Sequence, residues 1–328
     1  MGDVELLRKA HDARGRIVDA IGRTIVGQTE VIDLMLITLL ARGHALLVGV
    51  PGLAKTLLVS TLASSLDLTF GRVQFTPDLL PADITGTDAV LDEADPAGNV
   101  HRRVRFLPGP IFHNLVLADE INRTPPKTQS ALLQAMQERS VTVGTSTHAL
   151  PNPFQVFATR NPIEQEGTYV LPEAQLDRFL LEVHVSYPSE SDEREIARRN
   201  SSPKTIDVTR VLTTQELLEL QDLVPRIPVT DAAVALAVSL TRATRPETGD
   251  DFIKQYVRFG AGPRGSLSLV LAAKARAALS GQAAADIDDV IALTPAVLRH
   301  RMVLSYRAEA EGQCDVDIVS HALKRTHL

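Results

Sequence analysis

Residues 49–56, GVPGLAKT, have the types and the spacing that suit phosphate binding. They match G-x-x-x-x-G-K-[ST] except that Ala54 replaces the last glycine. In such a loop the backbone N–H groups and the start of the next helix face an anion, Lys55 adds positive charge near the β and γ phosphates, and Thr56 offers a hydroxyl to Mg²⁺. The alternative is a plain Gly-Pro turn with a solvated lysine. We expect a nucleotide to contact Gly49, Val50, Pro51, Gly52, Leu53, Ala54, Lys55, Thr56 and Leu57.

Two adjacent carboxylates follow another apolar run, where Asn114 to Ala118 leads into Asp119 and Glu120. Because side chains alternate along a strand, the two carboxylates point in different directions. Asp119 can therefore accept from the water shell of Mg²⁺, while Glu120 polarises a separate water for attack on the γ-phosphate. Any strand that enters a surface turn can end this way, but the upstream loop favours a metal site.

Asn161 follows the apolar run from Phe154 to Thr159 and precedes Pro162. An amide can donate and accept at once, so it can orient the attacking water. The alternative is an ordinary turn residue before proline, and Asn161 by itself favours that alternative.

Two arginines occupy positions that favour an anion. Arg264 starts a helix, close to the positive end of its dipole, and Arg178 directly precedes an apolar strand. An arginine supplied by a neighbouring subunit can stabilise transition-state charge, and Arg123 is a rival to Arg178 for that role. The alternative for each is a surface ion pair, for Arg178 with Asp177 or Glu173.

The elements that must position these residues divide the chain in two. Short, nearly continuous apolar runs up to residue 187 predict a parallel sheet buried on both faces, with helices between several strands. From residue 188 to 328 we expect a helical domain without strands, with Asp231, Ser266 and Asp286 as helix N-caps. An insert at 84–106 carries an acidic turn, 92–96, then the basic 101–105, and 140–153 alternates like a hairpin.

Composition narrows the function classes. At 328 residues the chain is long enough for about two domains, and 23% charged with 44% hydrophobic residues is typical of folded globular proteins. The net charge of −6 argues against non-specific nucleic-acid binding. The single Cys314, and the lack of a signal peptide or a stretch able to span a membrane, predict a cytoplasmic protein.

Together these motifs resemble the MoxR family of AAA+ ATPases over nearly the whole chain. The resemblance rests on GVPGLAKT at 49–56, QFTPDLLPADITGT at 74–87, LADEINRTPPKTQSALLQAMQER at 117–139, ATRNPIEQEGTYVLPEAQLDRF at 158–179 and GPRGSLSL at 262–269. It implies a P-loop core, a helical lid packed over the nucleotide and assembly into a ring, typically hexameric. Arg160 stands where glutamine is more usual in this family.

The resemblance also assigns roles and cofactors. It implies ATP and Mg²⁺, with Lys55 and Thr56 as Walker A, Asp119 and Glu120 as Walker B, Asn161 as sensor 1, Arg178 as arginine finger and Arg264 as sensor 2. Val26 and Gly27 look like part of the adenine pocket, and the 84–106 and 140–153 stretches resemble the helix-two insert and the pre-sensor hairpin, which face the ring pore. Lys55, Arg264 and a neighbour's Arg178 would then counter the phosphate charge.

The implied function is chaperone-like maturation of partner protein complexes, often beside proteins with von Willebrand A domains. Two alternatives remain. A nucleic-acid motor could use Arg102-Arg103-Val104-Arg105 on a strand in the pore, and a nucleotide-gated scaffold could bind ATP with little turnover.

Overall fold

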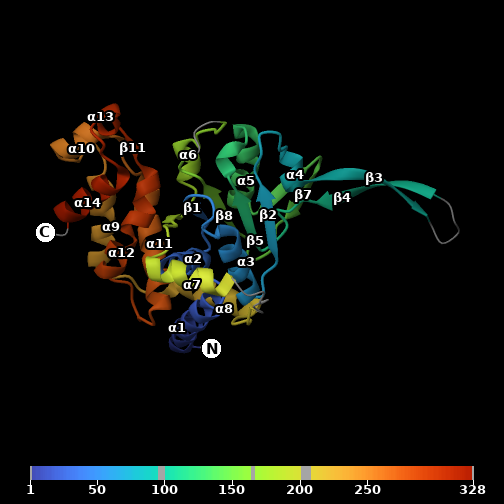
Figure 1. Ribbon diagram of the computed structural model, residues 1–328, viewed down its shortest axis with the longest axis horizontal. Coiled ribbons are helices and arrows are strands. Elements are labelled where there is room, and N and C mark those ends of the chain that lie inside the picture. The colour runs from blue at the N-terminus through green and yellow to red at the C-terminus, as the bar shows by residue number, and fades with distance from the viewer. Residues whose placement is uncertain (1, 95–99, 164–166, 201–207, 327–328) are drawn as a thin grey trace.

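A five-stranded parallel sheet organises the first half of the chain in the computed structural model, which describes residues 2–94, 100–163, 167–200 and 208–326 (Figure 1). The strand order is β2-β5-β8-β1-β9, and every neighbouring pair is parallel. The strands are β1 (Ala45–Val48), β2 (Phe70–Gln74), β5 (Leu115–Asp119), β8 (Gln155–Arg160) and β9 (Leu181–His184). The predicted α/β core with a central parallel sheet is confirmed.

Helices cover both faces of this sheet. They are α1 (Asp3–Gly22), α2 (Thr29–Leu40), α3 (Lys55–Ser65), α5 (Pro126–Glu138) and α6 (Glu173–Leu176), with a short 3₁₀ turn, η1 (Ile121–Arg123). Alternate strand residues face opposite ways, so Leu47 and Leu117 pack with α1, α2 and α3, whereas Leu46 and Val116 pack with α5. Burial on both faces is why these strands read as continuous apolar runs.

Two antiparallel hairpins interrupt the core. After α4 (Pro81–Thr85), β3 (Gly86–Ala94) pairs with β4 (Val100–Pro108) in a ribbon that projects far from the body (Figure 1). The acidic segment predicted as a turn begins inside β3, because Asp92 is still paired with Arg102; Asp95 and Pro96 lie outside the described residues. Within 140–153, β6 (Ser140–Val143) pairs with β7 (Ser146–Ala149).

The second half is mainly helical. It contains α7 (Glu190–Asn200), α8 (Thr214–Leu223), η2 (Val224–Arg226), α9 (Asp231–Ala243), α10 (Asp251–Tyr256), α11 (Pro263–Leu279), α12 (Ile287–Leu298), η3 (Arg299–Arg301), α13 (Tyr306–Ala310) and α14 (Asp315–Thr326). The expectation of no strands was wrong, because β10 (Val257–Phe259) pairs with β11 (Val303–Leu304). Among the described helices, none is long and apolar enough to cross a membrane.

Only one of the three predicted N-caps occupies that position. Asp286 caps α12, and its N–H donates to the Asp289 carboxylate at 3.0 Å. Thr230, not Asp231, caps α9 by accepting from the Ala233 N–H. Ser266 lies inside α11, which begins at Pro263 because proline is already set for the first helical turn.

The helical half shares an apolar core with the sheet. α8 packs against α1 and α2, α11 packs against the same two helices, and α12 packs against β9. One buried apolar cluster runs through all of these elements. A boundary at residue 187 would therefore cross a continuous core rather than a gap between two cores.

Candidate functional site

The GVPGLAKT loop connects β1 to α3 and requires unusual backbone geometry. Gly52 has φ +86° and Ala54 has φ 54°, both in the left-handed region. Alanine thus adopts at position 54 the conformation for which the general pattern uses glycine. At Gly49 a Cβ would lie 2.6 Å from the Val185 carbonyl oxygen, so only glycine fits beside the end of β9.

A cleft of about 370 Å³ lies between this loop and the carboxyl ends of the strands. Its lining residues are Pro51, Gly52, Leu53, Ala54, Lys55, Thr56, Leu57, Arg72, Gln74, Asp119, Glu120, Thr159 and Asn161. The structure therefore brings together the lysine, the hydroxyl, both carboxylates and the amide that the sequence singled out. Parallel strands make this possible, because their carboxyl ends share one edge.

Lys55 is the first residue of α3, and its ammonium bonds to its own loop. Its Nζ donates to the carbonyl oxygens of Gly49 at 2.5 Å and Val50 at 2.8 Å. Burial lowers the pKa of Lys55, while the carboxylates of Asp119 and Glu120 act in the opposite direction. The lysine is thus held by two carbonyl groups of its own loop, and an anion in the cleft could take their place as its partner.

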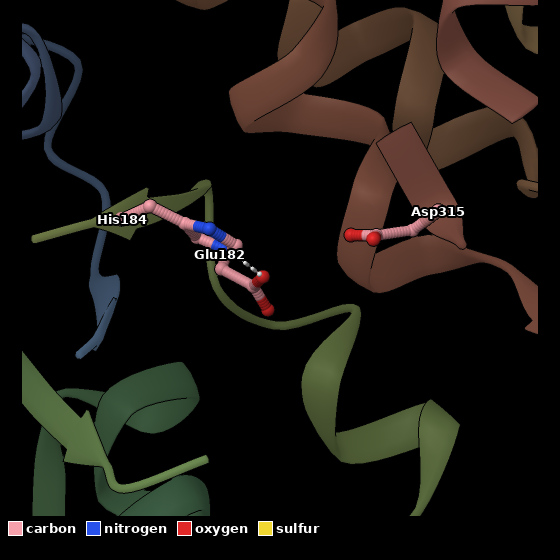
Figure 2. Close-up of side chains that lie close together, drawn as sticks. All are labelled: Glu182, His184 and Asp315. Atoms are coloured by element: carbon pink, nitrogen blue, oxygen red, sulfur yellow. Dashed lines mark hydrogen bonds and ion pairs between the residues drawn. The ribbon is translucent and has the colours of Figure 1, made fainter. Parts of the chain in front are cut away.

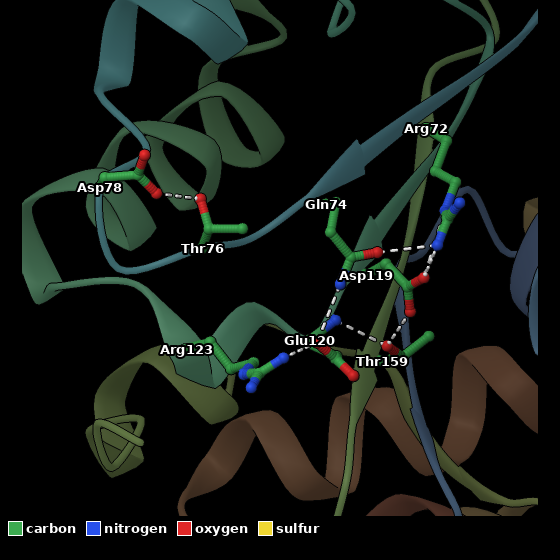
Figure 3. Close-up of polar contacts among 8 residues, drawn as sticks. All are labelled: Arg72, Gln74, Thr76, Asp78, Asp119, Glu120, Arg123 and Thr159. Atoms are coloured by element: carbon green, nitrogen blue, oxygen red, sulfur yellow. Dashed lines mark hydrogen bonds and ion pairs between the residues drawn. The ribbon is translucent and has the colours of Figure 1, made fainter. Parts of the chain in front are cut away.

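A threonine on the neighbouring strand holds the Asp119 carboxylate and the Glu120 backbone (Figure 3). The Thr159 hydroxyl donates to Asp119 Oδ1 at 2.6 Å and accepts from the Glu120 N–H at 2.8 Å. Glu120 has φ 57°, which turns its side chain away from that of Asp119. Because β5 ends at Asp119 and Glu120 is left-handed, strand alternation alone does not set the direction of the Glu120 side chain.

Arginine and glutamine side chains contact both carboxylates (Figure 3). Arg72 donates to Asp119 Oδ2 from Nη2 at 2.7 Å and from Nε at 3.2 Å. Glu120 Oε2 accepts from Gln74 Nε2 and from Arg123 Nη1, each at 2.8 Å. Arg123, the rival for a role in a neighbouring subunit, thus pairs with the carboxylate of its own chain.

The donor set fits a magnesium nucleotide. Mg²⁺ prefers oxygen ligands and few carboxylates, and the Thr56 hydroxyl and Asp119 carboxylate line the same cleft as Lys55. Asn161 is buried at the rim, where its Oδ1 accepts from the Ile163 N–H at 3.1 Å. That bond belongs to the turn that the sequence offered as the alternative role of Asn161. The side chain also lines the cleft.

Val26 and Gly27 line a separate cavity of about 420 Å³ between α1, α2 and α7. Gln28 Nε2 donates to the Ser186 carbonyl oxygen at 3.2 Å, and the Val185 N–H donates to the Val48 carbonyl oxygen. Val185 and Ser186 directly follow β9, so this second cavity and the phosphate loop both lie beside the carboxyl end of β9.

Arg178 and Arg264 lie where the parallel strands begin, which we call the amino edge of the sheet; the phosphate loop lies at the carboxyl edge, where the strands end. They line a pocket of about 330 Å³ with Arg42, Arg139 and Arg301, where Asp177 is the one carboxylate among the described lining residues. This pocket adjoins the amino ends of β1 and β9, whereas the phosphate loop follows the carboxyl end of β1. The expectation that Arg264 joins Lys55 at one nucleotide is not met within a single chain, because α11 packs on α1 and α2 and starts at the amino edge.

The buried guanidinium of Arg301 holds together the segments that form this arginine pocket. Arg301 donates to Asp177 Oδ1 at 3.0 Å and to the carbonyl oxygens of Phe179 at 2.6 Å and Leu180 at 3.2 Å. Burial lowers the pKa of Arg301 to about 10, against the opposing effect of Asp177. Asp177 also lies 3.7 Å from Arg264. Among the described residues none forms an ion pair with Arg178, so the ion-pair alternative for that residue finds no support.

Three polar side chains lie near one another where α14 approaches β9. Glu182, His184 and Asp315 approach one another from these two elements, with ligand atoms within 4.8 Å (Figure 2). His184 Nε2 lies 2.7 Å from Glu182 Oε1, and Arg160 lies 3.5 Å from Glu182 Oε2. The buried Glu182 carboxylate is thus already balanced by side chains of the sheet, and we assign no metal to it.

Sequence reasoning missed Thr159, Arg72, Asp177 and Arg301. A usable signal for Thr159 was a polar residue directly after the apolar run Val156 to Ala158, near the end of β8. Asp177 entered only as a partner for Arg178. Nothing in the local sequence marks Arg301, whose contacts with Asp177 and Phe179 join residues more than 100 positions apart.

Comparison with known proteins identifies the family. The family described as "ATPase family associated with various cellular activities (AAA)" matches residues 44–181, and an AAA lid domain matches residues 251–322. The chaperone MoxR1 of Mycobacterium tuberculosis is 44% identical over 95% of this chain and 81% of its own, and the protein MoxR of Paracoccus denitrificans is 33% identical over 87% of each chain.

A solved structure agrees over the whole fold. The crystal structure of a candidate ATPase from Cytophaga hutchinsonii superposes with a TM-score of 0.85 at 39% identity, covering 97% of this chain and 96% of that one. The relatives, the cleft and the strand order agree, and this chain belongs to the MoxR family of AAA+ ATPases.

Proposed function

We propose that this protein hydrolyses ATP at the subunit interfaces of a ring, typically a hexamer, and uses the cycle to mature or activate partner protein complexes. The observation that carries the proposal is the cleft in which Lys55, Thr56, Asp119 and Glu120 meet at the carboxyl edge of the sheet. That cleft offers a cation and N–H donors for phosphates, oxygens for a metal and a carboxylate for a water.

Within one subunit the chain's residues divide the work. The loop N–H groups and Lys55 hold the β and γ phosphates, and Thr56 and Asp119 hold Mg²⁺. Mg²⁺ bound there neutralises charge on the phosphate oxygens. Glu120 orients and polarises the attacking water, with Asn161 as its second hydrogen-bond partner. Val26 and Gly27 contact the adenine.

The second half of the site comes from a neighbouring subunit. Arg178 and Arg264 lie at the amino edge, and four residues of β1 separate that edge from the loop, a length of roughly 13 Å at 3.3 Å per residue. Of the five arginines in this pocket, Arg42 is paired with Asp222 and Arg301 with Asp177, and the remaining positive charge favours a further anion. We assign that anion to the triphosphate held by the adjoining subunit.

Mixed assemblies test this division. Purified Lys55→Ala is expected to lose ATP binding, and Glu120→Gln to bind ATP without turnover. Glu120→Gln subunits retain Arg178, and Arg178→Ala subunits retain Glu120, so a mixture of the two rebuilds complete interfaces. Turnover in the mixture above that of either variant supports the proposal. Wild-type protein that neither binds nor hydrolyses ATP contradicts it, and a mixture that gains nothing contradicts the shared site.

The client is sought with the same variant. Glu120→Gln with ATP should retain its partner during purification from the native cell, and we expect a protein complex, in some cases with a von Willebrand A domain. An activation step that persists in Glu120→Gln would instead favour the nucleotide-gated scaffold.

A nucleic-acid motor is the second candidate, and the arginines on the projecting ribbon favour it. Arg102 and Arg105 lie on β4, exposed to solvent. Single-stranded DNA that accelerates ATP turnover with a steep salt dependence would decide for the motor.

A further inference from the structure

Asp119, the carboxylate proposed to serve Mg²⁺, is already bonded through both of its oxygens. Oδ2 accepts from two nitrogens of Arg72, and Oδ1 accepts from Thr159. The Asp119 side chain is 13% exposed, whereas that of Arg72 is 48% exposed. A guanidinium thus bonds the oxygen that a metal or its water shell would use, and it can leave into solvent without unpacking the core.

The position of Arg72 follows from the strand on which it lies. β2 is the edge strand beside β5, with Gln74 in register with Asp119. Arg72 and Gln74 are two residues apart and therefore point to the same side, where they contact Asp119 and Glu120 respectively. Arg72 also donates to Gln74 Oε1 at 2.7 Å, which holds its guanidinium against the carboxylate.

We propose that Arg72 competes with the metal of this site: it bonds to Asp119 while the cleft holds no magnesium nucleotide and is displaced when one binds. This inference rests on the proposed function. Among the described residues that line the cleft, Arg72 and Lys55 are the two cations. A free divalent ion must displace Arg72 with no compensation, whereas a nucleotide brings phosphate oxygens that accept the released guanidinium. Arg72 thereby makes metal binding depend on nucleotide.

Metal binding, rather than turnover, tests this directly. The probe is Mn²⁺ added to the full chain, with free Mn²⁺ followed by electron paramagnetic resonance first without nucleotide and then with a saturating non-hydrolysable ATP analogue. Because the contact is half exposed, Arg72→Gln is expected to lower the half-saturating Mn²⁺ concentration about three- to tenfold without nucleotide. With the analogue bound, phosphate oxygens compensate for the released guanidinium, so the variant is expected to differ from the wild type by less than this.

Arg123→Gln is the matched control. It removes one positive charge from the same network but contacts Glu120 rather than Asp119. A much smaller shift in Arg123→Gln supports the competition. An unchanged or higher Mn²⁺ requirement in Arg72→Gln overturns the inference, as does an equal shift in both variants, because that would be a general effect of charge.

Failure of the proposed function is recognised separately. Wild-type protein that binds no ATP analogue at any metal concentration contradicts the nucleotide site itself. Wild-type protein that binds the analogue, with an Arg72→Gln variant that needs as much Mn²⁺ as the wild type without nucleotide, contradicts only the role of Arg72. Should Arg72→Gln fold poorly, Arg72→Lys keeps the charge with fewer donors, and its requirement must fall below that of the wild type.

Discussion

Acidification from pH 7 to pH 5 is expected to destabilise the fold by about 2 kcal/mol through His44 alone. His44 is buried next to the start of β1, where its Nδ1 accepts from the Val156 N–H at 2.9 Å. Its Nε2 must then donate to the Met136 carbonyl oxygen at 3.2 Å. Burial lowers the pKa of His44 from 6.5 to about 4, and nearby Arg139 acts in the same direction.

The sign follows from where the proton binds. Above pH 6.5 neither state is mostly protonated, so the full stability is present. As the pH falls from 6.5 toward 4, His44 binds a proton in the unfolded chain but not in the native protein, and the free energy of unfolding therefore decreases. With these two pKa values, the difference in proton binding at pH 5 is worth RT ln(33/1.1), about 2 kcal/mol.

Urea unfolding at pH 7, 6 and 5 measures this loss. His44→Asn keeps an acceptor for the Val156 N–H but removes the titrating ring. The variant is therefore expected to be less stable at pH 7, and its free energy of unfolding should depend less on pH. The gap between wild type and variant should shrink by about 2 kcal/mol between pH 7 and pH 5. His300, whose pKa burial also lowers, titrates in both proteins and cancels. Parallel pH profiles would refute the reasoning.

Three further substitutions test the geometry of the site, and a fourth is a control. Thr159→Val preserves volume but removes the hydroxyl that bonds to Asp119 and to the Glu120 N–H, so under the proposed function turnover should fall about 10- to 100-fold while the affinity for an ATP analogue stays within about threefold; equal losses in both would contradict this. Asp177→Asn removes the charge that balances Arg301 and should cost about 2 kcal/mol in urea unfolding, because the guanidinium is buried; an unchanged midpoint would count against it. Gly49→Ala should cost about 1–3 kcal/mol through its clash with β9, whereas Gly15→Ala, with open space in α1, should stabilise by about 0.5–1 kcal/mol.

The half of the site that follows from local chain geometry could be predicted. The loop follows β1, Asp119 ends β5 and Glu120 follows it, and a parallel sheet gathers such strand ends at one edge. The continuous apolar runs predicted buried parallel strands, and parallel strands place their carboxyl ends side by side.

The rest depends on how distant segments pack, which residue patterns do not encode. Arg264 could be placed at a helix start, but nothing local indicates that α11 packs on α1 and α2 and so carries it to the amino edge. The short β10 and β11 were missed for the same reason, since two or three residues show no period and pair across more than 40 positions.

The contacts of Arg301 tie the two arginines to one rigid unit. Arg301 belongs to η3 of the helical half, yet it bonds to Asp177 and to the backbone of the segment that carries Arg178. Arg264 approaches the same Asp177 from α11. Rotation of the helical half relative to the sheet would therefore either move the Arg178 segment with it or separate a buried ion pair, which costs several kcal/mol. If the proposed function holds, Asp177 thus keeps Arg178 and Arg264 together as one unit that faces a neighbour's phosphates.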